Sequence, residues 1–201
     1  METLSQSERN ALLDIARQAI VAAVNGEKPA ELNLNDFSPM LRAQGASFVT
    51  LTENGDLRGC IGTLSAYQPL IVDVQEHAVA AALDDPRFMP VSAEEVQNLE
   101  IEISRLTQPQ ILDYANSDDL LAKIRPGKDG IVLRDERRRA TYLPQVWEKI
   151  PNPEDFLDSL CLKMGAPRNL WRHRHLIVET YRVEEFGEPK KYGHLPLRGC
   201  R

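Results

Sequence analysis

The stretch SFVTLTENGDLRGCIG, Ser47 to Gly62, decides the fold of the first half of the chain. Its first part, Ser47 to Glu53, is rich in β-branched and aromatic residues, which favour a strand. Asn54-Gly55 supplies the two positive φ angles of a tight hairpin turn. We therefore predict an antiparallel hairpin whose return strand runs from Asp56 to Gly62.

Helix signals flank this hairpin. Apolar residues recur at helical spacing from Leu12 to Val24, Ser5 and Glu8 have the spacing of a capping box, and Gly26 suits a C-terminal cap. After the hairpin, a helix is predicted from Pro69 to about Leu83, because proline is well tolerated in a first turn.

Further signals continue along the chain. A second capping box from Ser92 to Glu95 predicts a short helix, and the alternation from Leu99 to Leu106 predicts a strand with one wet face. The remaining patterns predict a helix capped by Ser117 that runs through Ile124, and strands at 130–134 and 140–143 joined by a turn at 135–139. They also predict helices starting at Pro144 and Pro153, and a long strand from His175 to Phe186.

Length, charge and cysteine usage bound the class of protein. With 201 residues the chain can bury a core in one domain or in two packed lobes. The net charge of −6 argues against nucleic acid or an anionic membrane as the main partner. No apolar run has membrane-spanning length and no signal peptide is evident, so we predict a soluble protein without a membrane partner.

The three cysteines stand far apart and form no C-x-x-C pair. This usage predicts neither a disulfide framework nor a structural zinc site, and it fits a reducing, cytoplasmic location. We expect no metal and no cofactor.

The strand LRGCIGTL, Leu57 to Leu64, carries the best candidate for chemistry. Strand alternation would place Arg58 and Cys60 on one face, about 7 Å apart, where a guanidinium favours the thiolate form of cysteine. Gly59 and Gly62 would leave the backbone open to a ligand, and Thr63 would offer the ligand a hydroxyl.

A purely structural interpretation of the same stretch stays open. Cys60 would then be a small buried hydrophobe, and the glycines would form a β-bulge. The functional interpretation makes Cys60 a nucleophile and Arg58 its activator, but no catalytic base is visible near them in the sequence.

Several long motifs resemble the AMME chromosomal region protein family (the AMMECR domain). They are LRGCIGTL after FVTL, AAALDDPRFMPV (80–91), LEIEIS (99–104), GKDGIVL (127–133) and ATYLPQVWE (140–148). The resemblance implies one domain over residues 1–201, with a core at about 7–186 and an irregular tail at 187–201. It also implies an α+β fold, mainly antiparallel β-sheet flanked by helices, with a larger and a smaller lobe and a cleft at the RGCIG segment.

The family pattern matches this chain at residues 57–63, 87–88, 130 and 141–144. Within the motif AAALDDPRFMPV (80–91), Asp85 and Arg87 are expected to point toward the same cleft as Cys60. The alternative is a helix-terminating turn that contains a local Asp–Arg pair.

The resemblance also implies partners. Microbial members of the family are often encoded beside a Memo-like protein and a radical SAM protein, and no reaction is firmly assigned to the family. This chain lacks the three-cysteine radical SAM signature. We therefore predict an accessory or binding component that acts with these two proteins. The alternative is an enzyme that uses Cys60 as nucleophile.

Weaker candidates lie near the C-terminus. His173 and His175 would share one strand face, a geometry that metals use, but no third ligand is near them in the sequence. Cys200 lies beyond the region of resemblance and inherits no role. A basic cluster could hold an anion or pair with the chain's acids: Arg168, Arg172, His173, Arg174 and His175.

Overall fold

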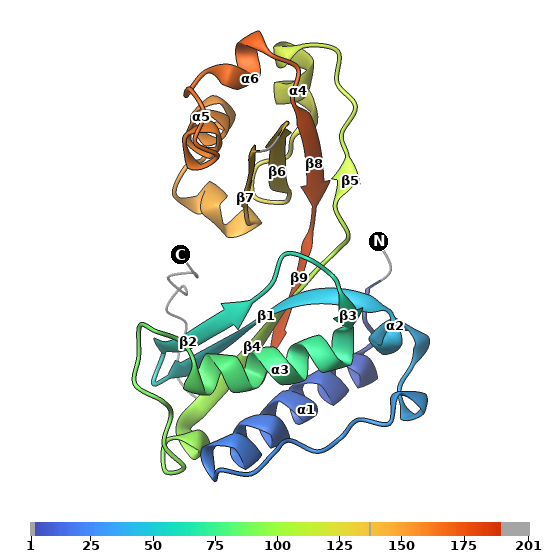
Figure 1. Ribbon diagram of the computed structural model, residues 1–201, viewed down its shortest axis with the longest axis vertical. Coiled ribbons are helices and arrows are strands. Elements are labelled where there is room, and N and C mark those ends of the chain that lie inside the picture. The colour runs from blue at the N-terminus through green and yellow to red at the C-terminus, as the bar shows by residue number, and fades with distance from the viewer. Residues whose placement is uncertain (1–2, 137, 190–201) are drawn as a thin grey trace. The chain divides into compact units, whose positions relative to one another are not determined.

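The computed structural model describes residues 3–136 and 138–189, which form two compact units (Figure 1). Unit 1 contains the chain up to Leu106 and resumes at Glu184; unit 2 is Thr107–Val183. Each unit has its own β-sheet and its own hydrophobic core. All strand pairs with a described register are antiparallel, and helices flank the sheets, so the predicted α+β class is confirmed.

The sheet of unit 1 is built on the predicted hairpin. Asn54 and Gly55 have φ angles of 54° and 88°, as a type I′ turn requires. The sheet order is β2-β1-β4-β9, and β3 pairs with the start of β1. These strands are β1 (Gln44–Glu53), β2 (Asp56–Gly62), β3 (Gln68–Pro69), β4 (Leu99–Leu106) and β9 (Val183–Gly187).

Helices α1 (Gln6–Val24) and α3 (Leu70–Leu83) pack against one face of this sheet (Figure 1). Both bonds of the predicted capping box between Ser5 and Glu8 are present. The core between these helices and the sheet contains, among others, Leu12, Ile20, Leu51, Ile71, Val74 and Ile101. Three short helical segments complete unit 1: η1 (Leu34–Asp36), α2 (Pro39–Arg42) and η2 (Val96–Asn98).

The capping box predicted at Ser92 is only half formed. The carboxylate of Glu95 accepts a hydrogen bond from the Ser92 backbone N–H, but only the 3₁₀ turn η2 follows. No α-helix begins here, because the next strand, β4, already starts at Leu99.

Unit 2 has the sheet order β5-β8-β6-β7. Its strands are β5 (Gln110–Ile111), β6 (Gly130–Asp135), β7 (Arg138–Tyr142) and β8 (Ile177–Tyr181). Its core includes Trp147, Phe156, Leu160 and Trp171. The helical segments are α4 (Ser117–Lys123), η3 (Pro144–Glu148), α5 (Pro153–Lys163) and α6 (Leu170–His173).

Two further predictions need correction. The long strand predicted from His175 to Phe186 is wrong: β8 ends at Tyr181, β9 begins at Val183, and the two belong to different sheets. The cap of α4 is Asn116, whose side chain accepts from two backbone N–H groups, and not Ser117. A side-chain oxygen one residue earlier reaches these N–H groups because Asn116 itself has extended backbone.

In the described residues no helix is long and apolar enough to cross a membrane.

Candidate binding site at the edge strand

The candidate site is built around β2, which is an edge strand of the unit 1 sheet. An edge strand presents backbone N–H and C=O groups that no neighbouring strand pairs. At Cys60 both groups are nevertheless bound. The Cys60 N–H donates to Asp85 Oδ2 at 2.8 Å, and Arg87 Nη2 donates to the Cys60 carbonyl at 3.3 Å. A turn after α3 thus binds the two backbone groups that a neighbouring strand could otherwise pair at this residue.

Asp85 and Arg87 also bind each other. Arg87 donates from Nε to Asp85 Oδ1 at 2.9 Å and from Nη2 to Asp85 Oδ2 at 2.7 Å. The Arg87 guanidinium is the main reason why the pKa of the Asp85 carboxyl lies well below its ordinary value, and the N–H of Cys60 lowers this pKa further. Asp85 is buried, whereas the Arg87 side chain is 38% exposed. The structure thus combines the two alternatives predicted for these residues. Asp85 and Arg87 form a local pair in the turn after the helix, and this pair contacts the backbone of Cys60.

Two local features bring Asp85 to Cys60. A Cβ at Gly59 would lie only 2.1 Å from the Ala81 carbonyl oxygen, so the missing side chain lets α3 approach β2 closely. Asp85 follows Ala81 by four residues, and Pro86 disfavours helical backbone at the residue before it. The helix therefore ends where Asp85 can reach the edge of β2.

Arg58 does not follow the predicted alternation. Leu51 pairs with Gly59 and Thr52 pairs with Leu57, so Arg58 is the extra residue of a β-bulge. A bulge in this stretch was part of the structural interpretation, and the structure places it at Arg58, beside Gly59.

The guanidinium of Arg58 is bound to the segment that follows α3. Its Nε donates to Glu95 Oε1 at 2.8 Å, and its two Nη atoms donate to the carbonyls of Met89 and Pro90. The hydrogen bond from Arg58 is the largest cause of the lowered pKa of Glu95, which is about 2. Arg58 thus ties β2 to the 89–95 segment.

The sulfur of Cys60 lies on the other side of the strand from α3. Cys60 Sγ is 3.2 Å from Oγ1 of Thr50, the opposite residue on β1, and Cys60 is 6% exposed. Gly62 lies against Ser47 and Phe48, and the Thr63 hydroxyl accepts from the Ser65 N–H in a local turn. The structure therefore brings together Cys60, Asp85 and Arg87.

Three residues of this site were missed from the sequence. The Phe88 ring links the two arginines, with the Cζ atoms of Arg87 and Arg58 at 5.5 and 6.0 Å from its centroid. Glu95 pairs with Arg58, although its spacing from Ser92 pointed only to a helix cap. Met89 is 81% exposed. The resemblance motif DPRFMP was the available signal for Phe88 and Met89.

The C-terminal candidates do not form a site. His173 ends α6 and His175 precedes β8, where its ring stacks on Tyr114 at 4.2 Å, so the prediction of one shared strand face is wrong. The arginines of the basic cluster pair with acids, which was the second alternative: Arg168 with Asp155 and Asp158, Arg172 with Glu154, and Arg174 with Asp135 and Glu136. Within the described ranges no group of three or more His, Cys, Asp or Glu residues could hold a metal. Cys200 lies outside the described residues.

Comparison with known proteins gives the same family as the motifs. The family model described as AMMECR1 matches residues 13–186. A protein of Methanothermobacter thermautotrophicus is 36% identical over 92% of this chain and 96% of its own length. Protein MJ0810 of Methanocaldococcus jannaschii is 31% identical, and the alignment covers 97% of both chains.

A solved structure agrees with these relatives. The crystal structure of uncharacterized protein PH0010 from Pyrococcus horikoshii matches with a TM-score of 0.77 and 31% identity, over 94% of each chain. The match over most of both chains shows that the two proteins share this α+β fold. The chain is a member of the AMMECR1 family.

Proposed function

We propose that this chain is an accessory or binding component that acts with a Memo-like protein and a radical SAM protein through the surface around LRGCIG. The observation that carries the proposal is the Asp85–Arg87 pair. It holds both backbone groups of Cys60 from outside the strand and leaves 38% of the Arg87 side chain exposed.

The hydrogen bonds of Arg87 support binding through a side chain. Nε and Nη2 donate to Asp85 and to the Cys60 carbonyl. Within the described residues, Nη1 makes no hydrogen bond, so its two donors can meet acceptor atoms of a partner. A guanidinium already held in one geometry loses little conformational freedom when a partner binds.

The hydrogen bonds that Asp85 and Arg87 make to the edge strand also support binding through side chains. Because Asp85 and Arg87 occupy the backbone groups of Cys60, an incoming strand cannot pair with them. A partner would instead contact the side chains presented beside the strand. The two partner proteins are taken from the gene context that the family resemblance implies. The proposal assigns no bond-forming step to Cys60.

The proposal is tested by calorimetric titration of the purified chain against the Memo-like protein and the radical SAM protein of the same organism. We expect a complex with at least one of them, and we expect Arg87→Ala to weaken it about tenfold or more, since truncated arginine anchors typically cost this much. Arg87→Lys, which keeps the charge but loses the planar fork, should also weaken it.

Arg168→Ala is the matched control, because Arg168 is exposed and pairs with surface acids in unit 2. It should bind like the wild-type chain. Thermal unfolding of each variant shows whether it is folded. Failure of the wild-type chain to bind either protein at micromolar concentrations would refute the proposal.

A further inference from the structure

Met89 is the most exposed large apolar side chain of the described residues, at 81%. The others in this group range from 42% to 68%: Val21, Tyr67, Ile111, Leu162 and Ile177. A single exposed apolar residue is ordinary and needs no explanation by itself. Met89 is set apart by its greater exposure and by its place in a loop whose main chain is hydrogen-bonded to Arg58.

Four hydrogen bonds fix the loop that carries Met89. Arg58 donates to the Met89 carbonyl at 2.9 Å and to the Pro90 carbonyl at 3.3 Å. On either side, the Phe88 N–H donates to the Asp85 carbonyl and the Val91 N–H donates to the Ala82 carbonyl. The loop therefore presents a mobile, polarisable side chain on ordered main chain, so binding would cost little chain entropy.

The net charge of the segment that carries Met89 indicates the chemistry of its partner. Residues 84–95 contain four acids and one arginine, a net charge of −3, and Arg58 brings this to −2. Asp85 and Glu95 are paired with Arg87 and Arg58. The remaining acids, Asp84 and Glu94, are exposed, and neither forms an ion pair within the part of the chain that the structure describes.

We infer that Met89 is the apolar anchor of the protein–protein contact, beside the polar contact of Arg87, and that it enters an apolar pocket of the partner whose rim carries lysine or arginine side chains. The inference rests on the proposed function above, and it names the contact residue and the kind of pocket. Apolar anchors that fill a pocket typically dominate such interfaces. The net negative charge of residues 84–95, with Asp84 and Glu94 exposed, repels phosphate groups and favours a cationic protein surface.

The experiment uses the same calorimetric titration with the partner that binds the wild-type chain. Met89→Ala should raise the dissociation constant about tenfold or more. Ile111→Ala is the matched control, since Ile111 is also exposed but lies in unit 2, and it should bind like the wild-type chain. The double variant Asp84→Asn, Glu94→Gln should bind more weakly and with a smaller dependence on salt concentration.

The outcomes separate this inference from the proposed function. If the wild-type chain binds and Met89→Ala binds equally well, the anchor is refuted while the proposed function stands. If the wild-type chain binds neither protein, the proposed function fails and the anchor fails with it. If Met89→Ala instead abolishes self-association of the wild-type chain, seen by sedimentation, the occupant is a second copy and the inference is overturned.

Discussion

At the scale of single residues, the charged pair of Asp85 and Arg87 explains how the backbone groups of Cys60 on the edge strand β2 are hydrogen-bonded. A buried carboxylate is costly unless it is paired and hydrogen-bonded, and Asp85 meets both conditions through Arg87 and the Cys60 N–H. The same contacts satisfy the backbone N–H and C=O of Cys60 on the edge strand. One residue pair thus serves the stability of unit 1 and shapes the surface on which the proposed function depends.

Asp85→Asn should lower the free energy of unfolding by about 2 kcal/mol, because a charge-assisted network is replaced by weaker neutral bonds. Urea unfolding at neutral pH measures the change. Asp84→Asn is the control, since Asp84 is adjacent but exposed, and it should have little effect. Equal effects of the two variants would contradict the structural role of Asp85.

The pH dependence of this loss follows from the pKa of Asp85, which is lowered in the folded state. Its contribution is complete above the ordinary aspartate pKa of about 4 and is lost as the pH falls toward the folded pKa. The wild-type chain should therefore lose stability below about pH 4 more steeply than Asp85→Asn does. Urea unfolding at stepped acid pH measures the two slopes. Parallel slopes would show that Asp85 is not held ionised by Arg87.

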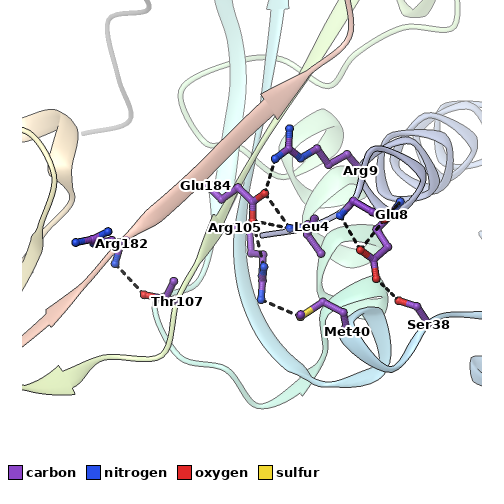
Figure 2. Close-up of polar contacts among 10 residues, drawn as sticks. Leu4, Glu8, Arg9, Ser38, Met40, Arg105, Thr107, Arg182 and Glu184 are labelled. Carbon is purple, nitrogen blue, oxygen red and sulfur yellow. Dashed lines mark hydrogen bonds and ion pairs between the residues drawn. The ribbon is translucent and has the colours of Figure 1, made fainter. Parts of the chain in front are cut away.

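At the scale of elements, Glu184 attaches β9 to the rest of unit 1 (Figure 2). Its carboxylate accepts hydrogen bonds from the Leu4 N–H at 3.0 Å, from Arg9 at 2.8 Å and from Arg105 at 3.1 Å. Arg105 lies on β4, while Leu4 and Arg9 belong to the region of α1. One buried carboxylate therefore joins the C-terminal strand to an N-terminal helix and to the neighbouring strand.

Glu184→Ala should lower the free energy of unfolding of unit 1 by about 3 kcal/mol, because two partly buried guanidinium groups lose their carboxylate. Chemical unfolding followed by far-ultraviolet circular dichroism measures this loss. Glu31→Ala, at an exposed position, is the control and should change little. A loss below about 0.5 kcal/mol, typical of surface substitutions, would show that Glu184 does not anchor β9.

At the scale of the whole molecule, the two units differ in how the chain builds them. Unit 2 is one continuous segment with its own sheet and core, whereas unit 1 needs residues from both ends of the chain. Residues 1–106 alone lack β9 and the Glu184 carboxylate. The inserted unit is therefore the better candidate for independent folding.

We expect the fragment 107–183 to fold by itself and the fragment 1–106 to remain largely unfolded or to aggregate. Both tryptophans of the chain, Trp147 and Trp171, are buried in unit 2, so tryptophan fluorescence reports on this unit alone. The isolated fragment should show the fluorescence maximum of the intact chain and unfold cooperatively in urea. A red-shifted maximum would mean that unit 2 depends on the rest of the chain.

Local patterns in the sequence were sufficient for the hairpin at Asn54-Gly55, the capping box at Ser5 and the alternating strand at 99–106. Each of these depends on residues a few positions apart, whose backbone preferences and side-chain periodicity act within the element itself. The motif resemblance also located LRGCIGTL and the DPRF turn as one region. It left their contacts undetermined.

Only the tertiary structure decided how these pieces meet. Arg58 pairs with Glu95, and the Cys60 N–H with Asp85, across 37 and 25 residues of sequence. Such contacts depend on where α3 ends and how closely it approaches β2 at Gly59, and no local periodicity encodes that approach. For the same reason the pattern from His175 to Phe186 read as one strand, although the two sheets divide it at Arg182. The sequence by itself determined the hairpin at Asn54-Gly55, the capped first helix, the strand at 99–106 and the family of this protein. The partners of Arg58, Cys60 and Asp85 were decided by packing between distant segments, because long-range contacts depend on the whole chain.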